Sequence, residues 1–419
     1  MASLPSLSIA RLSFAWRLGL LYAALFLVVG CYLPYLPVWL SWRRLGADQI
    51  AVLLAAPLFT RILFTPAISF AADRLGDRRK ILIGLAWGSL ISFLLLWAAD
   101  GFFTMLLATV LLAINWTTIM PLIETVAVSG IRFRALDYGR VRLWGSISFI
   151  VASLGAGFVI GCVGPGVVMP LLVVAAWLVI LGVHLLPPEL TESAARSPAS
   201  HGPKLKDAVD LFRAPLFLLF LLAASCVQAS HALYYSFGSL HWRAQSIPAG
   251  AIGALWSVGV VAEVALFAVS GRVIAYCGTA RLLMLAGLAA ALRWACMAID
   301  PPLLLTALLQ TLHAMSFGAA HLAAIHFMAH AVPSDRAATA QGLYAAVVAG
   351  LVLGLVTIAC GPLYRTFAGE AYAAMAMLAL IGAGCAYLLM QRWRGGLVAG
   401  SDAAQPHSAG GGGKTLPAS

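Results

Sequence analysis

The chain has 419 residues, of which 62% are hydrophobic and 10% charged, with a formal net charge of +11 at pH 7. Soluble domains average about 45–50% apolar and about 25% charged residues, so this composition excludes an ordinary soluble protein. Runs of roughly 20 apolar residues, the length of a membrane-spanning helix, recur along almost the whole sequence. We therefore predict an all-α integral membrane protein.

Twelve membrane-spanning helices are predicted from the apolar runs. The first is too long for a secretory signal peptide and ends without a small-residue cleavage site, so we interpret it as a spanning helix. The approximate bounds in chain order are 16–40, 49–72, 81–99, 102–130, 140–161, 167–186, 214–239, 248–271, 281–299, 302–331, 337–361 and 371–391.

A change of composition divides these helices into two groups of six. Residues 187–213 are polar and charged and contain Pro and Ser, which predicts a cytoplasmic linker between an N-terminal half, 1–186, and a C-terminal half, 214–395. Residues 396–419 are rich in Gly, Ala and Ser and are predicted to be a disordered tail. This plan is typical of transporters whose halves move about a site at the membrane midplane.

The basic residues follow the predicted topology. Of the 26 Lys and Arg residues, four fall in loops opposite the N-terminus and three lie deep inside spans, which leaves 19 in loops or at span ends on the side of the N-terminus. The positive-inside rule makes that side, with both termini, cytoplasmic. Because topology accounts for the charge, we predict contact with the lipid bilayer and no nucleic-acid partner.

The sequence contains few patterns that would indicate a bound metal or cofactor. The seven cysteines are scattered without metal-like spacing, and His326 and His330, four residues apart, lack a third ligand. No nucleotide-binding loop occurs. We therefore predict no metal and no cofactor.

Charged side chains inside the predicted spans are the candidate functional residues, because insertion scales put the cost of one at a helix centre at about 2.5–3.5 kcal/mol. In the N-terminal half these are Arg61, Glu124 and Arg142. The spans that carry Glu124 and Arg142 form a hairpin, so the two side chains are expected to pair. Tyr32 and Phe149 are expected to add an aromatic wall to a substrate site.

The C-terminal half carries Glu263, Arg293 and His313, which are expected near the middle of a ~30 Å apolar core. An ionisable group is needed to couple transport to protons, and Glu263, His313 and also His321 are candidates. A structural role, in which buried pairs hold helices together, remains the alternative for any one of them.

The embedded charges also indicate the substrate. Three arginines face two glutamates, which leaves one uncompensated positive charge, and a guanidinium group binds a carboxylate through two hydrogen bonds. The spans therefore favour a small organic anion, carried together with a proton.

The segment ADRLGDRRK, residues 72–80, resembles the loop signature of the major facilitator superfamily, although Ser69 stands where that pattern usually has Gly. The resemblance implies that Asp73 caps or pairs at a helix end and that a basic cluster braces the inward gate. The residues assigned to this gating loop are Asp73, Arg74, Gly76, Arg78 and Arg79.

Four further segments are similar to the phenylpropionate permease family, which is related to the lactose permease type of proton symporter: YLPYLPVWL (32–40), PLIE (121–124), YGRVRLWGS (138–146) and LLQTLHAMSFGAAH (308–321). The resemblance implies a monomer in the bacterial inner membrane that imports a small aromatic carboxylate with protons by alternating access.

The same resemblance implies roles for single residues. Glu124 and Arg142 match the sugar-contacting pair of the lactose type. Glu263 matches its acid in the eighth span, and Arg293 and His313 match its coupling residues in the ninth and tenth spans. Ser316 stands where the lactose type has its proton-carrying glutamate, so the proton carrier cannot be carried over.

Two other functions remain open at this stage. A symporter for a neutral sugar or nucleoside would tolerate the loss of Arg61 better than a carboxylate carrier. A membrane-bound acyltransferase would use His330 and Asp335 in the segment HAVPSD; we predict that the protein is not an enzyme.

Overall fold

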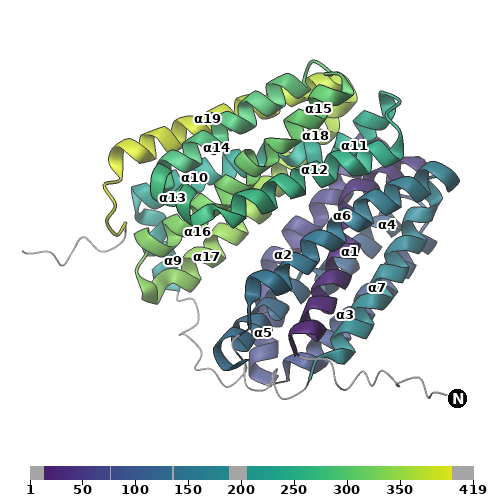
Figure 1. Cartoon of the computed structure of the whole chain (residues 1–419), viewed down its shortest axis with the longest axis horizontal. Helices are drawn as coiled ribbons and strands as arrows, with labels where there is room; N and C mark the ends of the chain where they lie inside the picture. The colour runs from purple at the N-terminus through teal and green to yellow at the C-terminus, as the bar shows by residue number, and fades with distance from the viewer. Residues whose placement is uncertain (1–13, 76, 135, 188–204, 399–419) are drawn as a thin grey trace, which may run out of the picture.

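The structure is a computed structural model that describes residues 14–75, 77–134, 136–187 and 205–398. Nearly all of these residues are helical, and no strand occurs among them. Two bundles of long helices stand side by side, purple to blue for the first part of the chain and green to yellow for the second (Figure 1). The prediction of an all-α protein is confirmed.

The first bundle is the N-terminal half. Its central helix, α1, packs along α6 and α7, while α3 packs against α4 and α7. The elements are α1 (Phe14–Trp42), α2 (Ala47–Leu75), α3 (Arg78–Ala98), α4 (Phe102–Trp116), α5 (Ile119–Arg134), α6 (Tyr138–Val163), η2 (Pro165–Val167) and α7 (Val168–Leu185).

The second bundle is the C-terminal half, in which α14 and α10 both pack along α19. The elements are α9 (Leu205–Arg213), α10 (Pro215–Ala229), α11 (Ala232–Ala244), α12 (Ala249–Ala268), α13 (Ser270–Cys277), α14 (Thr279–Met297), α15 (Leu303–Thr311), η3 (Ala314–Gly318), α16 (Ala319–Ala331), η4 (Ser334–Arg336), α17 (Ala337–Ala346), η5 (Val347–Val352), α18 (Leu353–Phe367), η6 (Ala368–Ala371) and α19 (Tyr372–Arg392).

The twelve predicted spans correspond to twelve passes of the chain. Eleven helical segments of the described chain are long and apolar enough to cross a membrane, and the last of them, Ser334–Arg392, contains two passes. These two passes are separated at Ala368, whose φ of 45° lies in the left-handed region and ends α18.

Several passes consist of shorter helices joined end to end. Ser230 and His231 separate α10 from α11, and a π-helical segment, η3, joins α15 to α16. Such π-helical turns widen the helix locally and are frequent at functional sites. His231 lies at the first of these breaks and Ser316 lies within η3, and both side chains are buried in the C-terminal half.

The bundle has two ends, which we name by the chain segments they hold. The linker side carries Phe14, Leu185 and Leu205, and the far side carries the opposite ends of the same helices. The linker prediction is not tested, since residues 188–204 lie outside the described part. Helix α9, at its end, is tied to η4 because Arg336 lies 3.5 Å from Asp207 and 3.2 Å from Asp210.

The predicted tail begins at residue 396, and its residues 399–419 lie outside the described part of the chain. Val398, the last described residue of the predicted tail, contacts the bundle, because its backbone N–H donates to the carbonyl of Ala331 at 2.8 Å. Since residues 399–419 lie outside the described part, the prediction of disorder in the tail is not tested.

The two halves touch most closely toward the far side. A Cβ on Gly157 would lie 2.5 Å from the carbonyl oxygen of Ala249, and one on Gly253 would lie 2.3 Å from that of Ser153. Only glycine allows helices α6 and α12 to approach this closely. Tyr35 of α1 strengthens the same contact by donating to the Ser153 carbonyl at 2.8 Å.

Candidate functional site

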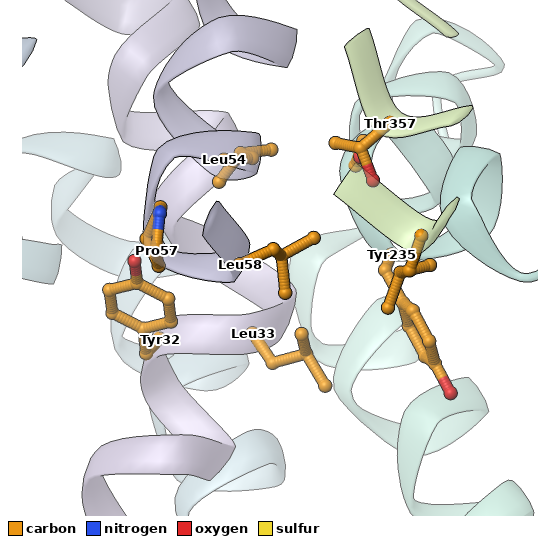
Figure 2. Close-up of a pocket in the computed structure, with 9 residues that line it drawn as sticks. Tyr32, Leu33, Leu54, Pro57, Leu58, Tyr235 and Thr357 are labelled. Atoms are coloured by element: carbon orange, nitrogen blue, oxygen red, sulfur yellow. The ribbon is translucent and has the colours of Figure 1, made fainter. Parts of the chain in front are cut away.

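A cavity lies between the two halves, close to these contacts. It has a volume of about 170 Å³ and is lined by α1 and α2 from one half and by α11 and α18 from the other. Figure 2 shows Leu33 and Leu58 directed across the gap toward Tyr235, with Tyr32 beside Pro57. The cavity is smaller than the ~300–1,000 Å³ typical of drug-sized ligands, so it suits a small, largely apolar group. The prediction that Tyr32 lies at the site is consistent with this position but remains untested by a ligand.

Arg61 follows the cavity along α2. Leu54 and Leu58 line the cavity, and Arg61 continues the same helix face at the i, i+4, i+7 spacing, one turn nearer the linker side. Its side chain is partly buried. Within the described part of the chain, no carboxylate lies within ion-pair distance of it. An unpaired cation thus lies next to an apolar cavity.

Glu124 and Arg142 are close to one another but do not form the predicted direct pair. Tyr138 donates its hydroxyl to Glu124 Oε2 at 2.8 Å. The Arg142 guanidinium instead lies over the ring of Phe26, 4.2 Å from its centroid, with the Tyr22 ring at 5.8 Å. Tyr138 lies one turn before Arg142 on α6, and its hydroxyl, rather than the Arg142 guanidinium, binds the Glu124 carboxylate. Arg142 is left without a carboxylate partner among the described residues.

Phe149 lies on the same face of α6 as Arg142, two turns further. Its side chain is buried in the core, and its backbone packs against α1, where a Cβ on Gly30 would lie 2.6 Å from the Phe149 carbonyl oxygen. The structure thus gives Phe149 a packing role, and its predicted contact with substrate remains untested.

Arg293 is the centre of a hydrogen-bonded network in the C-terminal half and is fully buried. Its Nη2 donates to Gln310 Oε1 at 2.5 Å, and its Nη1 lies 3.1 Å from His313 Nδ1 and 3.3 Å from Ser316 Oγ. The rings of Tyr234 and Trp294 lie 4.7 and 4.5 Å from the guanidinium carbon, at cation–π distance. Arg293 lies one turn before the last residue of α14, nearer the far side than the predicted mid-depth.

His313 connects this network to Glu263. Its Nε2 lies 3.7 Å from Glu263 Oε2, a contact in which His313 is buried and the Glu263 side chain is 20% exposed. The rings of His313, Phe317 and His321 stack on successive turns with interplanar angles of 3° and 4°. The prediction that Glu263, Arg293 and His313 lie together is therefore matched by the geometry, with His321 one ring further along.

Two polar residues of the network were missed in the sequence. His231 is fully buried, with its Nε2 3.1 Å from Ser316 Oγ and its Nδ1 3.1 Å from the Val227 carbonyl. Gln310 is fully buried as well. The available signal was the pair Ser230-His231 inside an apolar span, which marks the break between α10 and α11.

The charges of the two halves act on one another. The Arg142 guanidinium lies within electrostatic range of both Glu263 and His321 of the opposite half. Arg142 of the N-terminal half and Glu263 of the C-terminal half therefore interact electrostatically.

The predicted gating loop stabilises its own half. Arg79 donates to the carbonyls of Leu186 at 2.8 Å and His184 at 3.0 Å, which ties α3 to the end of α7. Arg74 is exposed and lies over the Phe70 ring, while Arg78 is buried. The side chain of Asp73 and the whole of Gly76 lie outside the described part of the chain.

Asp77 caps a helix in this loop. The Lys80 backbone N–H donates to Asp77 Oδ1 at 3.0 Å, which holds the pKa of this carboxyl below its usual value. The cap satisfies an otherwise free N–H at the start of α3.

No group of three or more His, Cys, Asp or Glu side chains able to hold a metal occurs in the residues that the structure describes. His330 Nδ1 is 2.8 Å from the His326 carbonyl, and the two rings stack at 5.8 Å.

Comparison with known proteins agrees with the fold. The sequence model of the family described as "MFS_1 like family" matches residues 15–374 of the chain. The chain is 30% identical over 371 residues to the "Probable 3-phenylpropionic acid transporter" of Escherichia coli (strain K12), covering 87% of this chain and 94% of that protein. It is 28% identical over 389 residues to the maltose permease of Geobacillus stearothermophilus, covering 90% and 94%.

Among solved structures, the nucleoside transporter NupG superposes with a TM-score of 0.75 at 18% sequence identity, covering 91% of this chain and 99% of that one. At this identity the likeness establishes the fold.

Proposed function

The chain belongs to the MFS_1 like family of membrane transporters, and we propose that it imports a small aromatic carboxylate together with protons by alternating access. It is a secondary transporter, not an enzyme. In this proposal the protein is a monomer in the bacterial inner membrane, its linker side and termini face the cytoplasm, and it needs no cofactor.

The observation that carries the proposal is that two embedded arginines have, in the described part of the chain, neither a carboxylate partner nor side-chain hydrogen bonds like those that hold Arg293. Arg61 lies one turn from the cavity, and Arg142 lies over an aromatic ring. A buried cation without a counter-ion is costly, and a bound carboxylate would supply the missing charge. The apolar cavity would hold the ring of such a substrate.

The contacts between the halves support an assignment of the state. Tight packing at Gly157 and Gly253 closes the far side. Asp48 of α2 and Arg365 of α18 form a further ion pair between the halves at the same end. We therefore interpret the structure as closed to the outside, with substrate exchange on the cytoplasmic side.

The test is uptake into proteoliposomes with an inward proton gradient, using 3-phenylpropionate, benzoate, maltose and uridine. We expect gradient-driven uptake of the carboxylates alone. Arg61→Gln should reduce it about 10–100-fold, because a hydrogen bond to a charged group contributes about 1.5–3 kcal/mol. Arg140→Gln is the matched control, since exposed Arg140 pairs only with Asp137 at 3.1 Å on its own helix. Uptake of maltose or uridine without carboxylate uptake would contradict the proposal.

A symporter for a neutral sugar or nucleoside is the second candidate. It is favoured by the similarity to maltose permease. Glu124, which accepts a hydrogen bond from Tyr138, would then be available to accept bonds from substrate hydroxyls. This candidate predicts that Arg61→Gln leaves uptake nearly unchanged.

A further inference from the structure

Hydrogen-bond chemistry fixes the proton positions in the network around Arg293. A guanidinium group only donates hydrogen bonds, so His313 Nδ1, which is 3.1 Å from Arg293 Nη1, must present its lone pair. His313 is therefore neutral and carries its proton on Nε2. That nitrogen faces Glu263 Oε2 at 3.7 Å.

His231 extends the same directed chain. Its Nδ1 faces a carbonyl oxygen, that of Val227, and must carry the proton. Its Nε2 consequently accepts from the Ser316 hydroxyl at 3.1 Å. With its hydrogen used in this way, Ser316 Oγ presents a lone pair to Arg293 Nη1 at 3.3 Å. His231 thus orients Ser316, and Ser316 helps to hold Arg293 against His313.

The consequence concerns which group can take up a proton. A proton added to His313 Nδ1 would point at a guanidinium N–H and would lie beside a buried cation. Glu263 has no such obstacle, because its one ion-pair contact in the described chain is with His313 Nε2, at 3.7 Å, and its side chain is 20% exposed. Protonation of Glu263 leaves every bond of Arg293 intact.

We propose that Glu263 takes up the transported proton, and that His231 is a positioning residue which, through Ser316 and Arg293, keeps His313 neutral. This inference rests on the proposed function and adds the identity of the proton carrier. It also explains how the chain works with Ser316 at the place where the lactose type has a glutamate.

The surroundings of Glu263 connect the proton to the substrate. The positive charge of Arg142 acts on Glu263, and a carboxylate bound at Arg142 would neutralise that charge. Proton and substrate would then favour one another's binding, which is the reciprocal coupling that symport requires. Three titratable or charged groups face Glu263 from the packed elements: Arg142 (α6), Tyr235 (α11) and His313 (between α15 and η3). Arg293 (α14) lies behind His313, and the charge of Arg142 also acts on His321 (α16).

The first test compares two substitutions under an inward proton gradient. Glu263→Gln should lower gradient-driven accumulation of 3-phenylpropionate at least 10-fold. His313→Asn should still accumulate substrate, at a reduced rate, because the amide oxygen provides an acceptor for Arg293. Loss of accumulation in His313→Asn together with its retention in Glu263→Gln would overturn the assignment.

The second test addresses His231 through Ser316, because a change at fully buried His231 can prevent folding. Ser316→Ala should shift the pH of half-maximal uptake by about one unit, since it removes a hydrogen bond to a charged group. Without the Ser316 hydroxyl, Arg293 is held less firmly against His313 Nδ1, so His313 can take up a proton. A positively charged His313 stabilises the ionised form of Glu263, and the shift should therefore be toward lower pH. Ser316→Thr, which keeps the hydroxyl, should restore the profile, and His231→Gln should move it as Ser316→Ala does.

Ser257→Ala is the control, because Ser257 is also buried but, among the described residues, bonds only to the Gly253 carbonyl of its own helix, at 2.8 Å. An unchanged pH profile in Ser316→Ala would contradict the role of His231.

Exchange of labelled for unlabelled substrate, without a proton gradient, separates the two proposals. If wild-type protein exchanges no carboxylate, the proposed function fails; if exchange is present but Glu263→Gln accumulates normally, only the proton assignment fails.

Discussion

The embedded charges of the two halves are organised in opposite ways. In the C-terminal half, Arg293 is fully buried, and hydrogen bonds and two aromatic rings surround its guanidinium group. In the N-terminal half, Arg61 and Arg142 have no carboxylate partner among the described residues. Both Nη atoms of Arg293 have hydrogen-bond partners without a ligand, although its buried Nε has none in the described structure, whereas we propose that an anion completes the second arrangement. In our proposal, the C-terminal half carries the proton and the N-terminal half binds the substrate.

The largest effect is expected from breaking the hydrogen-bonded network around Arg293. Arg293→Leu leaves Gln310, Ser316 and His313 without their shared donor, and removing one member of a buried charged network costs about 3–5 kcal/mol. We expect a marked fall of the melting temperature of the purified protein in detergent. Arg336→Gln is the comparison, because its partners Asp207 and Asp210 are only partly buried on the linker side. Equal melting temperatures for the two variants would remove the distinction between the halves.

The N-terminal half should respond in the opposite sense. Arg142→Gln should leave the melting temperature of the ligand-free protein unchanged or raise it, because it removes an uncompensated charge. Binding of 3-phenylpropionate should weaken about 10–100-fold, as measured by titration calorimetry. A fall in ligand-free stability as large as that of Arg293→Leu would show that Arg142 has a structural partner.

How far these features were predictable depends on the residue type. Arg293, His313 and Glu263 stand out because a charge in an apolar run is costly, and their grouping follows from matching depth. His231 and Gln310 pass unnoticed, since a single polar residue in a span is compatible with ordinary packing. The direct Glu124–Arg142 pair was expected from the hairpin, but Tyr138, one turn earlier on the same face, takes the carboxylate. Such competition depends on side-chain reach, which sequence spacing does not contain.

The overall fold was predictable to a greater degree. Apolar runs determine the number of passes, because each must be about as long as the bilayer is thick. The breaks inside the passes were not predicted, since Ser230 and His231 differ little from other small or polar residues. The close approach of α6 and α12 was not predicted either, because the many glycines of the chain do not indicate which of them, such as Gly157 and Gly253, face another helix.

The smallest effect is expected at the far side. Asp48→Asn removes the ion pair with Arg365 between the halves, and exposed pairs of this kind contribute about 0.2–1 kcal/mol. We expect a shift of at most about fivefold in the ratio of outward-open to inward-open molecules, measured by distance distributions between spin labels on the far ends of α2 and α18. No shift would mean that packing at Gly157 and Gly253 alone closes this side.

The central claim is that Arg61 and Arg142 of the N-terminal half bind the carboxylate group of the substrate. Titration calorimetry of the wild-type protein with 3-phenylpropionate and with its uncharged amide tests it most directly. We predict that the carboxylate binds at least 10-fold more tightly than the amide, and that Arg61→Gln abolishes this preference while Arg140→Gln retains it. Equal affinity for the two ligands in the wild-type protein would contradict the account.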